Sequence, residues 1–241
     1  MPDAPDDFDY SQVGEFTANL DSSELAARLY SPAGYARTAQ MLYATDFSKG
    51  ISGLDPDVTV GLGTIVLSTD HSSLSGLALK LTNSSNDDVD CFVGTTIPFV
   101  LARYYTLDIG FYLNGEEGET RLELYVFYEG VSHHLDLYLQ QNPFRLIFRD
   151  VNNNYVDITS YETSESYFGN FYHLRATIDI ETRLMKELTI NSVPFEVSSL
   201  EYMINEASYV NQIALDIGAR TNSAFDVTMY LQWVFAGLSN F

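Results

Sequence analysis

The residues of this chain that could do chemistry are mainly carboxylates. A retaining glycosidase needs two carboxyl groups about 5 Å apart, and a single β-strand can present two such groups on one face. Asp179 and Glu181 have the required spacing, but they stand beside a predicted turn, where we expect both side chains to be solvated. Glu119 and Glu123 also share a face, yet an extended strand separates them by about 13 Å. The carboxylates therefore do not predict a hydrolase, and we assign no catalytic residue.

Two segments rich in Asp and Asn are candidate calcium sites, because hard cations prefer carboxylate and carbonyl oxygens on irregular backbone. The candidate ligands are Asp87, Asp88 and Asp90 in the first segment, and Asp150 and Asp157 in the second. Neither segment matches an EF-hand loop. The alternative is a metal-free turn built on Asn and Asp side chains. Calcium is the only cofactor that the sequence leaves open.

Aromatic residues in predicted loops are candidates for sugar binding. Pyranose faces stack on exposed rings, and polar groups nearby bind the hydroxyls. The chain contains 17 tyrosines and 15 phenylalanines. The candidates with polar neighbours are Tyr155, Tyr161, Tyr167 and Phe168. The alternative is that these rings pack at the edge of the domain or at an interface, where aromatic residues are also enriched.

The histidines and the cysteine form no recognisable motif. His133 and His134 are adjacent on a predicted strand, so their side chains point to opposite faces and cannot chelate one ion together. Cys91 is the only cysteine, which excludes an intrachain disulfide. We expect its thiol to be buried and to pack as a small hydrophobic group.

These side chains would be positioned by β-strands, because apolar and polar residues alternate from about residue 41 onward. Leu122, Leu124 and Val126 alternate with Glu123 and Tyr125, for example. Near the end of the chain, one apolar stripe is predicted to contain Val227, Met229, Leu231, Trp233 and Phe235.

Turn-forming residues at 114–119, 129–130 and 150–154 separate such runs. About ten to fourteen short strands at this spacing predict an all-β fold, a two-sheet antiparallel β-sandwich of the jelly-roll type.

The first forty residues differ from the rest. Asp21 and Glu24 have the spacing of a capping box, which predicts a short helix over 22–30, and Pro32 and Gly34 would end it. We therefore expect an N-terminal arm over 1–40 and a sandwich domain over 41–241. The arm either packs on the domain or contacts a neighbouring subunit.

Charge and hydropathy narrow the range of partners. The net charge of −21, from 12 basic and 33 acidic residues, disfavours nucleic acid and anionic membranes as partners. No apolar stretch approaches the roughly 20 residues of a membrane span. The acidic N-terminus, Met1–Asp7, does not resemble a signal peptide. We expect synthesis in the cytoplasm, with later incorporation into a virion as one destination.

Several segments between residues 45 and 238 resemble strands of the concanavalin A-like lectin/glucanase superfamily, nearest to its laminin-G-like members. They are Asp46–Gly50, Ser75–Leu81, Phe171–Asp179, Leu188–Asn191 and Val227–Phe235. The resemblance implies a jelly roll whose relatives include lectins, glycosidases, adhesion modules and virus structural proteins.

The chain departs from this superfamily at several functional positions. Its glucanases carry a Glu-x-Asp-x-Glu strand, whereas Thr177 takes the first carboxylate position of the nearest segment here. Ser192 stands where Gly is usual, and Gln232 where Asp is frequent. The leading hypothesis is therefore a non-catalytic structural or surface module that forms a homo-oligomer, such as a decoration or tail-associated component of a virus or phage particle. The alternative is a lectin-like glycan-binding protein, assisted by calcium, and a glycosidase is third.

Overall fold

The computed structural model describes residues 40–45, 47, 50–51, 53–58, 63–71, 76–83, 89–114, 119–141, 144–158, 171–207, 211–221 and 227–239. All sixteen regular elements within these ranges are β-strands, paired antiparallel in two sheets. Within the same ranges, no helix is long and apolar enough to cross a membrane. The predicted all-β, two-sheet antiparallel sandwich is confirmed. The predicted helix over 22–30 lies outside the described residues, so the arm stays a prediction.

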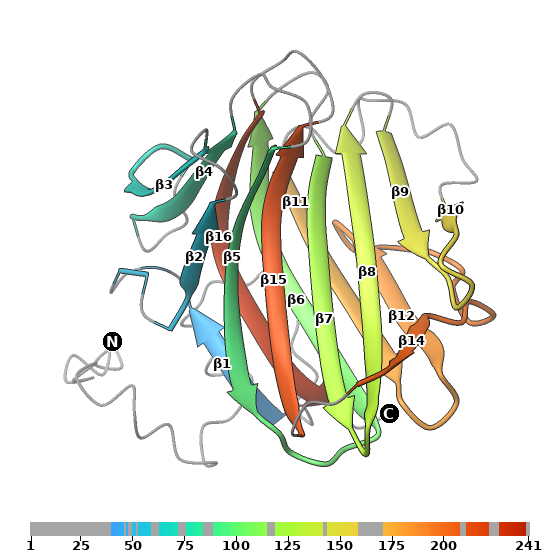
Figure 1. Cartoon of the computed structure of the whole chain (residues 1–241). Coiled ribbons are helices and arrows are strands. Elements are labelled where there is room, and N and C mark those ends of the chain that lie inside the picture. The colour runs from blue at the N-terminus through green and yellow to red at the C-terminus, as the bar shows by residue number, and fades with distance from the viewer. Residues whose placement is uncertain are drawn as a thin grey trace, which may run out of the picture.

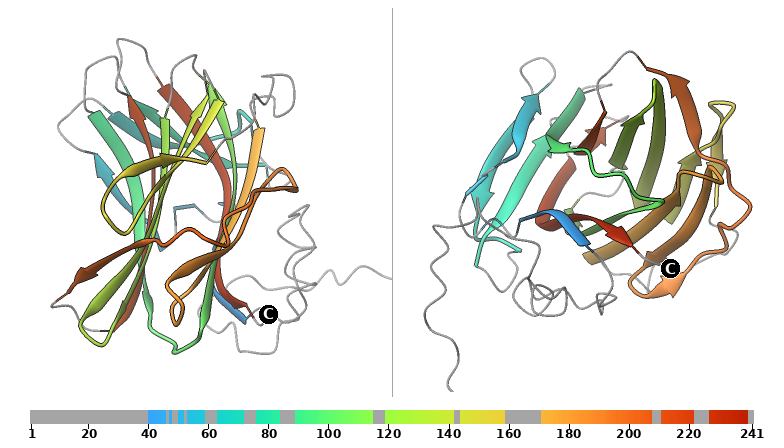
Figure 2. Two further views of the ribbon diagram at one scale, coloured as in Figure 1. Left: turned by 90° about the vertical axis from the view of Figure 1, so that its right-hand side faces the viewer. Right: turned by 90° about the horizontal axis from the view of Figure 1, so that it is seen from below.

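The two sheets face each other as the layers of the sandwich (Figures 1 and 2). In order, sheet A contains β13 (Val193–Pro194), β12 (Leu184–Ile190), β11 (Phe171–Asp179), β6 (Tyr104–Asn114), β16 (Val227–Ser239), β4 (Ala78–Asn83) and β3 (Gly63–Ser68), and β1 (Gln40–Thr45) also pairs with β16. In order, sheet B contains β10 (Tyr155–Asp157), β9 (Phe144–Arg149), β8 (Val131–Gln141), β7 (Glu119–Tyr128), β15 (Gln212–Thr221), β5 (Val89–Pro98) and β2 (Asp55–Val58), and β14 (Met203–Glu206) also pairs with β8.

The core lies between the sheets and follows the predicted alternation. Leu107 and Ile109 of β6 pack from sheet A, and Leu122, Leu124 and Val126 of β7 from sheet B; all are buried. Burial of each such side chain contributes about 1.5–3 kcal/mol. Because every second residue points into the core, the intervening residues of β7 and β8 form the outward face of sheet B.

β16 departs from the predicted stripe. Its pairing with β6 shifts register between Leu231 and Trp233, so one residue is inserted in the ladder. Val227–Leu231 therefore supplies core residues as predicted, but from Val234 onward the alternate set faces the core instead. The prediction that Trp233 and Phe235 continue the stripe is wrong, because a bulge moves the following side chains to the other face.

The segment likened to an opening strand also differs. The first strand in the described part of the chain is β1, which ends at Thr45, and Phe47 follows it in a bend with φ of 63°. The buried ring of Phe47 nevertheless joins the core.

Candidate functional site on sheet B

The predicted site residues that the structure describes lie on two different strands and a turn. Tyr161, Tyr167, Phe168, Asp87 and Asp88 lie outside the described residues, so they stay predictions. Asp90 lies in β5, and Tyr155 and Asp157 lie in β10.

The carboxylate of Asp150 closes a turn between β9 and β10. Its Oδ1 accepts the backbone N–H groups of Asn154 at 2.7 Å and of Asn152 at 2.9 Å, and these bonds lower the pKa of Asp150. Asp157 lies three residues beyond Asn154, about 10 Å farther along the hairpin, and pairs with Arg145 at 3.6 Å. The two acidic residues therefore do not meet, and calcium binding at either stays a prediction.

The suggested carboxylate pair Asp179 and Glu181 lies at the end of β11 in sheet A. The expectation that Asp179 is solvated is wrong: it is buried, and Arg103 donates to both of its oxygens at 2.8–3.1 Å. Although burial alone would raise the pKa of Asp179, the bonds from Arg103 and from the backbone of Thr182 and Glu181 lower it. Glu181 is exposed and also pairs with Arg103, at 3.1 Å. A general acid needs a raised pKa, so Asp179 is poorly suited to that role.

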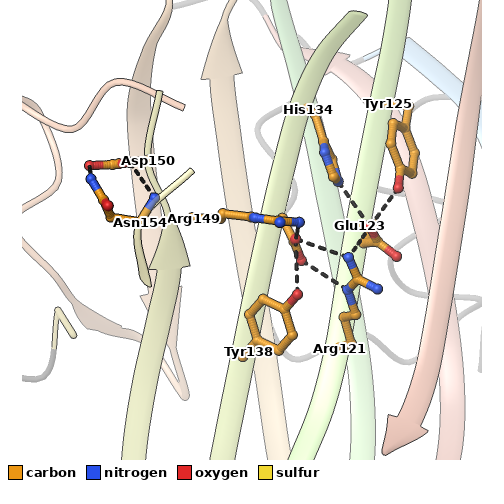
Figure 3. A network of polar contacts seen from close by, with 9 residues as sticks. Arg121, Glu123, Tyr125, His134, Tyr138, Arg149, Asp150 and Asn154 are labelled. Carbon is orange, nitrogen blue, oxygen red and sulfur yellow. Dashed lines mark hydrogen bonds and ion pairs between the residues drawn. The ribbon is translucent and has the colours of Figure 1, made fainter. Parts of the chain in front are cut away.

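A continuous row of polar side chains crosses the outward face of sheet B. In register, Asp216 of β15 lies opposite Glu123 of β7, Glu123 lies opposite Asp136 of β8, and Arg149 of β9 lies opposite Tyr155 of β10. Arg149 Nη1 closes the remaining gap by donating to Asp136 Oδ2 at 3.4 Å. Side chains directly opposite each other share one face. We call these five residues the polar row; Figure 3 shows Glu123 and Arg149 from it.

Arg121 holds the centre of the polar row together. It lies two positions before Glu123 on β7, and its Nη2 is 2.9 Å from Glu123 Oε1. Its Nε and Nη2 also donate to the two oxygens of Asp136, at 3.2 and 3.1 Å (Figure 3). Because like charges directly opposite in a sheet destabilise it, Glu123 and Asp136 depend on this guanidinium. The Asp136 side chain is fully buried, whereas that of Arg121 is 21% exposed.

Glu123 remains ionised at neutral pH. His134 Nε2 lies 2.9 Å from its Oε1, and the Tyr125 hydroxyl donates to the same oxygen. Burial alone would raise the pKa of Glu123, but the bond from His134, the charge of Arg121 and the bond from Tyr125 outweigh it and lower the pKa. Since a carboxylate only accepts hydrogen bonds, His134 carries its proton on Nε2.

The hydroxyl of Tyr125 stays protonated at neutral pH. Burial raises the pKa of its hydroxyl, and the charges of Glu123 and Asp216 raise it further. The hydroxyl is therefore a fixed hydrogen-bond donor rather than a base.

Glu123, His134 and Asp136 could each offer one ligand atom to a metal, and these atoms lie within 4.8 Å of one another. The spacing also resembles that of a retaining carboxylate pair. However, the guanidinium of Arg121 lies within 3.1 Å of both carboxylates and supplies the positive charge that a metal ion would bring. The lowered pKa of Glu123 also opposes a role as general acid. The centre of the row is thus an internally satisfied ion-pair network.

At its β10 end, unlike at its centre, the row has an exposed side chain and, among the described residues, an unsatisfied polar atom. Arg149 Nε is buried and has no hydrogen-bond partner within the described part of the chain. The guanidinium carbon of Arg149 lies 5.5 Å from the centre of the Tyr155 ring, and this ring packs edge-on against Tyr138 at 5.4 Å. Tyr155 is 58% exposed. This end therefore offers an exposed ring beside a partly exposed guanidinium, and it contains one of the predicted sugar-binding residues.

Sequence reasoning missed the centre of the site, although the signal was present. Glu129 and Gly130 form the two-residue turn between β7 and β8, both with positive φ. Such a turn sets the register of a hairpin. Counting back from it places Glu123 opposite Asp136, as observed.

Comparison with known proteins finds the same fold in solved structures of low sequence identity. No protein-family profile matches the chain, and no curated protein does so either. Among solved structures, a carbohydrate esterase of the Shiga toxin-encoding bacteriophage phi24B shares 12% identity, with a TM-score of 0.58 over 84% of this chain and 100% of the other.

Two further structures share the same sandwich. An endo-β-1,4-glucuronan lyase of the fungus Trichoderma reesei is 10% identical, with a TM-score of 0.57 over 83% of this chain and 96% of that one. The carbohydrate recognition domain of Emp47p is 11% identical, with a TM-score of 0.54 over 86% of this chain and 100% of that one. At these identities the likeness concerns the fold alone. It agrees with a concanavalin A-like jelly roll, while the laminin-G-like subgroup stays a prediction.

Proposed function

We propose that this protein is a carbohydrate-binding module that holds its ligand on the outward face of sheet B. The observation that carries the proposal is the exposed ring of Tyr155 beside the guanidinium of Arg149, whose side chain is 22% exposed. A sugar ring has an apolar C–H face and a rim of hydroxyls, which match an aromatic ring and a guanidinium respectively. The fold-level likeness to enzymes and binding domains that act on carbohydrates supports the same class of ligand.

The rest of the row would position this pair. Asp136 receives hydrogen bonds from both Arg121 and Arg149, so it ties the ligand-facing arginine to the buried network. Arg149 also lies over Tyr155, which limits the motion of both side chains. A surface held in place before binding loses less entropy on binding.

The proposed module binds and does not cleave. The carboxylates at the centre of the row are occupied by Arg121, and Glu123 has a lowered pKa. Glu123 therefore lacks the raised pKa of a glycosidase acid, and Asp136 is held by two arginines. Structures with this sandwich include enzymes as well as binding domains, so the distinction is drawn from these side chains and not from the fold.

The test is glycan binding by wild-type protein and by two tyrosine variants. Tyr155→Ala is expected to weaken binding by about tenfold or more, as for a central aromatic contact. Tyr104→Ala is the matched control, because Tyr104 also lies under an arginine, Arg103, at 4.9 Å, but on sheet A. Equal loss in both variants, or no loss in either, would contradict the proposed site.

An assembly role is a second proposal. The chain would be a surface component of a virus or phage particle, homo-oligomeric and attached through residues 1–40. A phage esterase among the structures with this fold supports that setting. Sedimentation of the full chain and of a chain lacking residues 1–39 tests the idea: a stable oligomer that dissociates on truncation is expected, and a monomer in both cases would oppose it.

A further inference from the structure

We infer that the glycan is uncharged and lies across the strands, along the polar row. This inference rests on the proposed carbohydrate-binding function and specifies its ligand class. It comes from the charge and the direction of the row, two features that the proposed function does not use.

On five strands of sheet B, the described outward side chains are more often acidic than basic. The described outward side chains of β7, β8, β9, β10 and β15 include five carboxylates and three arginines, which gives a formal charge of −2 when His134 is neutral. The carboxylates are Glu119, Glu123, Asp136, Asp157 and Asp216, and the arginines are Arg121, Arg145 and Arg149. The whole chain carries −21. A uronic acid, sulfate or phosphate would therefore approach a face of its own sign.

Each of these arginines already faces a carboxylate. Arg121 pairs with Asp136 and Glu123, and Arg145 pairs with Asp157 at 3.6 Å. Arg149 pairs with Asp136 at 3.4 Å. An anionic sugar would have to compete with these partners for the guanidinium groups. A sugar hydroxyl carries no charge. It can accept from the partly exposed Arg149 guanidinium or donate to carboxylate oxygens without displacing these partners.

The row also gives the ligand a direction. From Tyr155 on β10 to Asp216 on β15 there are four inter-strand steps, which span about 19 Å at 4.8 Å each. A ligand that reaches both ends is thus an oligosaccharide rather than a single sugar.

A glycine makes room for the carboxylate at the β15 end of the row. Gly94 of β5 lies opposite Asp216, and a Cβ there would come within 2.2 Å of Asp216 Oδ1. The missing side chain lets the carboxylate lie over β5, away from Glu123, so acceptor oxygens spread along the row instead of clustering at its centre.

The experiment is calorimetric titration of the full chain with oligosaccharides of increasing length. The neutral probes are cello-, manno- and galacto-oligosaccharides, and the acidic probes are oligoglucuronates and oligogalacturonates of equal length, each at low salt and at about 0.5 M salt. We expect a neutral series to bind at least tenfold more tightly than either acidic series, to gain affinity with length, and to change less than about twofold with salt.

Two variants test the charge argument directly. Asp157→Asn removes one charge from the outward face without changing a member of the polar row. It is expected to increase affinity for acidic probes about threefold while the neutral series changes less than twofold. Glu187→Gln is the control, because it removes the same charge from β12 of sheet A.

Three outcomes would overturn the inference. Tighter, salt-sensitive binding of acidic probes would refute the neutral class and leave the carbohydrate-binding proposal intact. Affinity that is independent of length would refute the cross-strand direction. Failure of every probe, neutral and acidic, would refute the proposed function together with this inference.

Discussion

Replacing Asp136 by Asn should destabilise the fold far more than the replacement of a carboxylate on the rim of the same sheet. Asp136 is fully buried and receives hydrogen bonds from Arg121, Arg149 and Tyr138. The asparagine amide keeps the shape of the side chain but loses the charge. It also replaces one acceptor oxygen by an NH2 group that faces donors.

The size of the effect follows from burial. Removing one partner of a buried ion pair costs about 3–5 kcal/mol, because the other charge stays desolvated. Here Arg121 and Arg149 are 21% and 22% exposed, and Arg121 keeps Glu123 at 2.9 Å. Partial access to water and this second partner reduce the expected loss to about 2–3 kcal/mol. For a chain of this size, that corresponds to a fall in Tm of about 4–12 °C.

Urea denaturation followed by circular dichroism measures the loss, and Asp157→Asn is the matched control. Asp157 pairs with Arg145 at 3.6 Å, but both side chains are about half exposed, at 42% and 53%. Such a surface pair contributes at most about 1 kcal/mol. If Asp136→Asn costs no more than Asp157→Asn, the central network is not desolvated as argued. Combining Asp136→Asn with Arg121→Met measures the coupling between the two side chains, and the combined loss should be smaller than the sum of the two single losses because one change already removes the shared ion pair.

Three further expectations follow from single residues. The pKa of Glu123 is lower in the folded chain than the unfolded value of about 4.3. Its contribution to stability is therefore complete above about pH 5 and is lost as pH falls through the folded pKa. In urea denaturation from about pH 2 to 6, Glu123→Gln should make the free energy of unfolding less dependent on pH. Gly94→Ala should cost about 1–3 kcal/mol by driving Asp216 towards Glu123, and added Asp216→Ala should restore part of it; equal stability of both variants would argue against the clash. Burial raises the pKa of the Cys91 thiol to about 11, so it should react with a thiol-specific dye only after unfolding, and rapid labelling of the native protein would contradict this.

Local features were the predictable ones. The hairpin of β11 and β12 was expected from the apolar alternation of Phe171–Asp179 and the return through Leu188, and the structure pairs these strands as a hairpin. The turn at Glu129 and Gly130 was also predicted, and it sets the pairing of β7 with β8. Alternation with a period of two reveals which residues of a strand share a face, because successive side chains point to opposite sides.

The predicted alternation of core and outward residues failed where a bulge interrupts β16. The bulge of β16 between Leu231 and Trp233 reverses the faces of the last part of the strand. An isolated strand does not reveal such an insertion, because it arises where one strand gains a residue relative to its partner. The burial of Asp179 was missed for a related reason: Arg103, 76 positions away, covers its carboxylate.

In the polar row, too, local sequence predicts some contacts and tertiary packing decides the others. Composition and periodicity were enough to predict an acidic, two-sheet β-sandwich, because both depend on residues close together in the chain. The hairpin turn was enough to place Glu123 beside Asp136. By contrast, Asp216 comes from a strand 93 positions after Glu123, and Arg149 reaches Asp136 from another strand. Strands so far apart align in whatever register lets their inward residues fill one core. Only that packing places Asp216 in one line with Tyr155 and Arg149 across sheet B.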